Sequence, residues 1–194
     1  MGREGRELDL ASSAMPAFVA LLRAVNLGPH NKIAMADLKA VAEGCGLSGA
    51  RTLLQSGNLL FEAKAKTSAA LEKLLEAALL EELGLKTPVL VRSATEWRAA
   101  RDENPFPKEA KADPSHLVVM PLKAKPDKAS HAALAAAIVG RETSKVVGQQ
   151  LYLFYPDGIG ESKLSAALIE KKLGVPGTGR NWNTAQKIAA ILEA

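Results

Sequence analysis

Arg51-Thr52-Leu53-Leu54-Gln55-Ser56-Gly57-Asn58-Leu59-Leu60-Phe61 is the stretch that decides the fold. Two apolar runs flank a short polar segment, a pattern typical of a strand, a tight turn and a second strand. Ser56-Gly57 favours the turn because glycine reaches positive φ at no steric cost, and the flanking leucines favour burial on a pleated surface. The rest of the chain must therefore supply apolar residues that cover this hairpin.

The chain has 194 residues, of which 47% are hydrophobic and 24% charged, values typical of a globular protein with one large domain or two small ones. A net charge of +4 permits a nucleic-acid or phosphate partner, although the 25 basic residues are scattered among 21 acidic ones. The single cysteine, Cys45, excludes an internal disulfide. No apolar run approaches the roughly 20 residues of a membrane span, and no secretory signal is visible. We therefore expect a cytoplasmic protein.

The first half of the chain predicts six elements. Residues 1–15 mix charged and small residues and predict a disordered extension or a start codon assigned too early. The apolar run at 18–22 predicts a buried strand, and apolar residues at helical spacing predict a helix over 35–45. The hairpin follows, then a helix over 70–79 and a strand at 88–91. This order predicts an α+β fold whose first subdomain, residues 16–95, is a ferredoxin-like βαββαβ unit.

The second half, residues 96–194, predicts a smaller α+β subdomain. A short helix around Trp97 is followed by a proline-rich stretch that breaks regular structure, and this segment marks the domain boundary. A strand at 117–122, a helix at 128–138 and a hairpin over 145–155 come next. Two glycine-rich loops then each lead into a helix, the first of them capped by Ser162. No tandem repeat is visible in the sequence.

Six separated motifs resemble the DUF1697 family of bacterial proteins over residues 15–194. They are Leu21-Leu22-Arg23-Ala24-Val25-Asn26-Leu27-Gly28 with Lys32, Arg51-Thr52 with Gln55-Ser56-Gly57-Asn58, Asn104-Pro105-Phe106, Tyr155-Pro156-Asp157-Gly158-Ile159-Gly160, Ser162-Lys163-Leu164, and Arg180-Asn181-Trp182-Asn183-Thr184. The resemblance implies an α+β fold with a ferredoxin-like first part. It implies no activity, because the family is one of unknown function.

Most catalytic patterns are missing from the sequence. Neither a P-loop nor a dinucleotide-binding glycine motif occurs, and the three histidines lack metal-ligand spacing, so we predict no metal and no cofactor. Ser162 is interpreted as a helix cap in preference to a nucleophile, and Cys45 as a buried, inert thiol. Acidic residues beside lysines, such as Glu72 and Glu170, are typical of solvated helix faces.

One polar constellation remains as a candidate ligand site. Its members are amides, charged side chains and one aromatic residue: Arg23, Asn26, Lys32, Gln55, Ser56, Asn58, Lys163, Arg180, Asn181, Trp182 and Asn183. Amides can read a base edge or a sugar, Arg and Lys can hold phosphate, and Trp can stack. The alternatives are that the asparagines satisfy backbone groups in turns, that Trp182 is a core residue, and that Arg180 pairs with an acidic neighbour.

We therefore expect a binding protein for a phosphate-bearing ligand, either a nucleotide or a short single-stranded RNA, held in a cleft between the subdomains. On this hypothesis Arg180→Ala weakens binding and leaves the melting temperature nearly unchanged. The first alternative is a small-metabolite enzyme that uses Lys163 or Lys32 for proton transfer. The second is a protein-interaction module, which requires a large apolar surface patch. The sequence does not indicate an oligomeric state.

Overall fold

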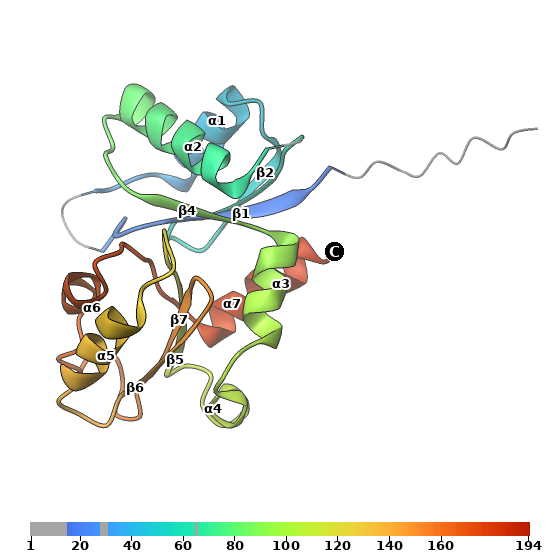
Figure 1. The fold of residues 1–194 in the computed structure, drawn as a ribbon. Coiled ribbons are helices and arrows are strands. Elements are labelled where there is room, and N and C mark those ends of the chain that lie inside the picture. The colour runs from blue at the N-terminus through green and yellow to red at the C-terminus, as the bar shows by residue number, and fades with distance from the viewer. Residues whose placement is uncertain (1–14, 28–30, 65) are drawn as a thin grey trace, which may run out of the picture.

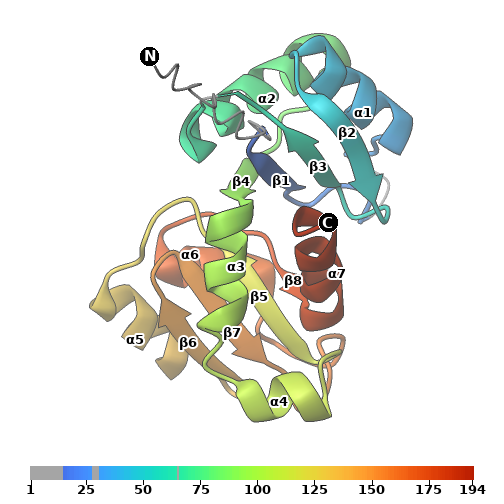
Figure 2. The same ribbon diagram turned by 90° about the vertical axis from the view of Figure 1, so that its right-hand side faces the viewer.

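The computed structural model describes residues 15–27, 31–64 and 66–194. Residues 1–14 of the predicted extension lie outside the described residues, as does His30. Two halves follow one another along the chain, and each contains a four-stranded antiparallel sheet (Figures 1 and 2). The chain is therefore an α+β protein, as predicted.

The first half has the predicted ferredoxin-like order. Its elements are β1 (Ala17–Leu22), α1 (Met35–Gly44), β2 (Ser48–Leu53), β3 (Asn58–Glu62), α2 (Ser68–Leu83) and β4 (Val89–Ser93). The strands lie in the order β2-β3-β1-β4. The hydroxyl of Thr67 caps the start of α2, and Gly84 ends it in the left-handed conformation that glycine adopts readily.

The second half repeats the topology of the first. Its elements are β5 (Leu117–Pro121), α5 (Lys128–Ala136), β6 (Thr143–Val147), β7 (Gln150–Phe154), α6 (Ala166–Leu173) and β8 (Arg180–Asn181), with strand order β6-β7-β5-β8. No tandem repeat was visible in the sequence, yet the predicted second α+β subdomain has the same order of elements as the first. Connecting segments of different length hide the repeat, and β8 is too short to be recognised from periodicity.

Each half ends in a further helix that follows its last strand directly. These helices are α3 (Ala94–Asp102), capped by Ser93, and α7 (Trp182–Leu192), capped by Asn181. A short helix, α4 (Pro107–Ala112), occupies part of the segment predicted to be irregular. The prediction failed there because proline is tolerated in the first turn of a helix, where its missing N–H has no intrahelical partner to lose.

Three apolar cores hold these layers together. The helices α1 and α2 cover one face of the first sheet, and α5 and α6 cover one face of the second (Figure 1). The helices α3 and α7 lie side by side and pack against the remaining faces of both sheets. Strand β1 is apolar throughout because alternate residues enter different cores: Phe18 and Ala20 face α1 and α2, whereas Val19 and Leu21 face α3 and α7.

The predicted hairpin is present as β2 and β3, joined by a four-residue turn over 54–57. Gly57 has a φ of +71° and lies so close to β1 that an added Cβ would be 2.6 Å from Val25 and 2.9 Å from Leu22. Both the conformation and the space require glycine. The turn thus fixes how closely the hairpin approaches the end of β1, where the candidate site begins.

Candidate functional site

A cleft of about 470 Å³ lies between the two halves, on the side of the second sheet that α5 and α6 cover. The first half contributes Leu22, Arg23, Ala24, Val25, Leu27 and Ser56 to its lining. The second half contributes Val118, Met120, Tyr155, Ile159, Ser162, Leu164, Ser165, Ala166, Ile169, Gly177, Thr178, Gly179, Arg180 and Asn181. Most of the lining side chains are apolar, so the cleft suits a ligand with an apolar body and a few polar groups.

Arg180 lies at the inner wall of the cleft and joins the two halves. Its Nε donates to Oδ1 of Asn58 at 2.5 Å, and its Nη2 donates to the carbonyl oxygens of Ser56 at 2.8 Å and Leu22 at 3.1 Å. Its Nη1 donates to Thr178 and to the Gly179 carbonyl, both at 2.9 Å. All of these acceptors are uncharged. Burial without a neighbouring carboxylate lowers the pKa of Arg180 to about 10, so it is still a cation at neutral pH.

Arg92 occupies the matching position in the first half, because each arginine directly precedes the residue that caps the following helix. Arg92 donates to the carbonyl of Leu122, which follows β5 as Leu22 ends β1. In each half, a buried arginine thus donates to the carbonyl of the matching leucine in the other half. Unlike Arg180, Arg92 has a carboxylate partner, the Glu72 Oε1 at 3.6 Å. Desolvation lowers the pKa of Arg92, and the Glu72 charge counteracts that shift.

A second pair of contacts, made of ion pairs, also joins the two halves at matching positions. Arg23, directly after β1, forms an ion pair with Glu170 on α6. Lys123, at the matching place after β5, forms ion pairs with Glu72 at 2.8 Å and Glu76 at 2.7 Å on α2. Glu72 and Glu170 stand at the same distance from the caps of their helices, Thr67 and Ser165.

The two sets of contacts differ in charge. We call Arg92, Lys123, Glu72 and Glu76 the first charge network, and Arg180, Arg23 and Glu170 the second. The position that corresponds to Glu76 is Gly174, the residue at which α6 ends. Within the described ranges, the first network therefore pairs two cations with two carboxylates, whereas the second has two cations and one carboxylate. The unmatched cation, Arg180, borders the cleft.

The structure places only part of the predicted constellation at the cleft. Four predicted residues line it: Arg23, Ser56, Arg180 and Asn181. Asn58 is fully buried and lies just behind them; its Nδ2 donates to the Leu53 carbonyl and the Ser56 hydroxyl. Asn58 thus connects the hairpin to Arg180.

The remaining predicted residues lie elsewhere. Lys32, Gln55 and Asn183 are exposed and are not among the residues that line the cleft. Asn26 has a φ of +56° and bonds the backbone of Ile33 and Gln55, so its amide satisfies backbone groups, as the alternative interpretation predicted. Trp182 is 4% exposed and packs in the core shared by α3 and α7. It cannot stack on a ligand in the cleft from that position.

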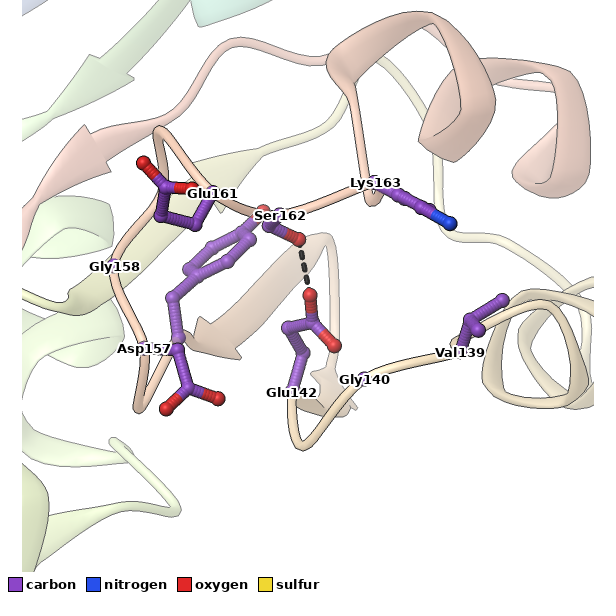
Figure 3. Close-up of a pocket in the computed structure, with 9 residues that line it drawn as sticks. Val139, Gly140, Glu142, Asp157, Gly158, Glu161, Ser162 and Lys163 are labelled. Carbon is purple, nitrogen blue, oxygen red and sulfur yellow. Dashed lines mark hydrogen bonds between the residues drawn. The ribbon is translucent and has the colours of Figure 1, made fainter.

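A smaller pocket of about 170 Å³ lies beside the cleft and contains Lys163 (Figure 3). Lys163 is exposed, and in the same pocket the Ser162 hydroxyl donates a hydrogen bond to Glu142. This bond lowers the pKa of Glu142. Ser162 does not cap α6, contrary to prediction: the cap is Ser165, whose hydroxyl accepts from the Leu168 N–H. The helix starts later than its apolar pattern suggested.

Several contributors to the cleft and its charge networks were not predicted from the sequence. Glu72 is 9% exposed and Glu170 pairs with Arg23, so neither belongs to a freely solvated helix face. Met120, Leu164 and Ile169 form an apolar wall of the cleft and were not among the predicted site residues. The segments Leu22-Arg23-Ala24 and Leu122-Lys123-Ala124 are similar in sequence, and this similarity could have indicated the repeat.

The described residues contain no group of three metal-ligating side chains. Cys45 is half-buried, and burial raises its thiol pKa, which makes it less reactive. Over the same ranges, no helix is long and apolar enough to cross a membrane.

Comparison with known proteins gives a family and a fold. The family described as "Protein of unknown function (DUF1697)" matches residues 15–152. No curated protein sequence matches the chain significantly. Among solved structures, the conserved bacterial protein SP0830 from Streptococcus pneumoniae is similar, with a TM-score of 0.72 and 20% identity over 92% of this chain and 99% of that one. This likeness shows a shared fold.

Proposed function

Since this chain belongs to DUF1697, a family of proteins of unknown function, we propose its function from its geometry: it binds a small organic anion with an apolar body in the cleft between its halves. One observation carries the proposal. Two arginines hold matching positions, and the one away from the cleft has a carboxylate partner, whereas the one that borders the cleft has only uncharged acceptors. The ligand anion would neutralise Arg180 as Glu72 neutralises Arg92.

The attraction acts through space, because the N–H groups of Arg180 are already bonded to protein oxygens. A buried charge without a counterion is strongly felt by an anion in a nearby cleft of low dielectric constant. Hydroxyl groups of Ser56 and Ser165 also line the cleft and can donate to the ligand. Met120, Leu164 and Ile169 supply apolar wall for its body. This lining favours a ligand less polar than the nucleotide or short RNA predicted from the sequence.

The test uses two fluorescent probes of nearly the same shape. 1-Anilinonaphthalene-8-sulfonate carries one negative charge, and N-phenyl-1-naphthylamine is its neutral counterpart. We expect the sulfonate to bind about tenfold more tightly at low salt, and this advantage to shrink as salt is added. Equal affinity for the two probes, or no binding of the sulfonate, would contradict the proposal.

A pair of variants locates the binding. Ala166 and Ala167 are both exposed in the first turn of α6, but only Ala166 lines the cleft. Ala166→Phe should fill the cleft and reduce sulfonate affinity at least about tenfold, whereas the matched Ala167→Phe should leave it unchanged. Both variants should unfold at similar urea concentrations. If Ala166→Phe binds the probe as well as Ala167→Phe does, the probe is not in this cleft.

A further inference from the structure

The ion pair between Arg23 and Glu170 lies at the edge of the cleft. Arg23 is one of the lining residues, and Ile169, the neighbour of Glu170, is another. The two side chains are 28% and 36% exposed, and Glu170 is connected to the cleft through Arg23, since Glu170 is not itself a lining residue. With Glu170 in place, the second charge network has an excess of one positive charge. A ligand with one negative charge therefore balances the network, whereas a second negative charge would face the Glu170 carboxylate.

We propose that Glu170 determines the charge of the ligand: it makes the cleft selective for monoanions, such as carboxylates, over dianions, such as phosphate monoesters. The inference rests on the proposed function, because it concerns the same cleft. Like charges that share a partly desolvated site repel strongly enough to discriminate between ligands. Arg23 bonds Glu170 through Nη2 and keeps further N–H donors for a ligand, but its positive charge is already balanced by the Glu170 carboxylate, which would repel a second ligand charge.

The first charge network supplies the comparison. There, Lys123 has two carboxylate partners, Glu72 and Glu76, and the arginine is already neutralised. Glu76 is also partly exposed, and its Oε1 accepts from the Val89 N–H, a bond that glutamine can keep. Glu76→Gln therefore removes the same charge as Glu170→Gln, but from a carboxylate that pairs with Lys123, which does not line the cleft, and not with the lining residue Arg23.

The experiment measures calorimetric binding of decanoate, a monoanion, and of decyl phosphate, a dianion at about pH 8. The wild-type protein should bind decanoate more tightly. In Glu170→Gln the ratio of the two affinities should move toward decyl phosphate by about tenfold, and in Glu76→Gln it should stay at the wild-type value.

The outcomes separate this inference from the proposed function. Two outcomes would contradict the inference and leave the binding function intact. In the first, the wild-type protein binds both ligands and the ratio of the two affinities is the same in Glu170→Gln. In the second, the wild-type protein binds decyl phosphate more tightly than decanoate. If it binds neither ligand nor the fluorescent sulfonate, the proposed function fails and the inference fails with it. If Glu170→Gln does not fold, the relative affinity of the wild-type protein for decanoate and decyl phosphate still tests the inference.

Discussion

Replacing Arg180 by methionine should destabilise the protein by about 3 kcal/mol. Loss of the guanidinium leaves Oδ1 of Asn58, in a side chain with 0% exposure, without a donor, which costs about 1–3 kcal/mol. The bonds to the Leu22 and Ser56 carbonyls, worth about 1.5–3 kcal/mol each as charged bonds, are lost as well. Removal of an unpaired buried charge returns several kcal/mol. The balance is a substantial loss of stability, whereas the sequence alone predicted almost none for Arg180→Ala.

Urea unfolding provides the assay, with a double-mutant cycle that adds Asn58→Leu. The midpoint of Arg180→Met should fall while the slope of the transition stays constant, because the surface exposed on unfolding hardly changes. The loss of stability in the double variant should be smaller than the sum of the two single losses by about 1–3 kcal/mol. The reason is that each single change leaves a buried partner without its hydrogen bond. Additive losses, or a single loss below about 0.5 kcal/mol, would refute a bridging role for Arg180.

Two further predictions concern capping and ionisation. Ser165→Ala should cost about 1 kcal/mol in urea unfolding because Ser165 caps α6, and the loss should be greater than that in Thr143→Ala, an exposed residue of an edge strand. The only two tyrosines, Tyr152 and Tyr155, are buried, and desolvation raises the pKa of both, that of Tyr155 to about 12. Native protein should therefore show almost no tyrosinate absorbance at about pH 10.5, whereas protein unfolded in guanidinium should show it for both residues. Because the unfolded chain loses these protons first, the tyrosines should lower the stability as the pH rises above about 10.

The sequence was sufficient where the signal was local. The turn at Ser56-Gly57, the continuous burial of β1 and the glycine that ends α2 all follow from neighbouring residues, so the first half was predicted in its correct order. The repeat in the second half was missed because its counterparts are joined by connections of different length: the hairpin turns through four residues in one half and through Gly148-Gln149 in the other.

The site was harder to predict because its key contacts are to backbone oxygens of the other half. Any residue supplies a carbonyl, so the bonds from Arg180 to Leu22 and Ser56 leave no trace in the residue types. The same limit applies to Glu72: a glutamate beside a lysine on a helix has the same appearance whether it faces water or a buried arginine. Arg23, Ser56, Asn58 and Arg180 were proposed from the sequence because polar residues recur in separate segments that resemble the family motifs.

The difference between the halves explains why an open cleft borders Arg180. In the first half, α2 continues far enough to carry Glu76, and its acids close the network around Arg92 and Lys123. In the second half, α6 is shorter and is reached through the long segment 155–165, which contributes several residues to the cleft wall. The same topology thus provides one charge-balanced copy and one copy with an additional positive charge that borders the cleft. Matched changes in the charge-balanced copy can therefore separate effects on folding from effects on a ligand.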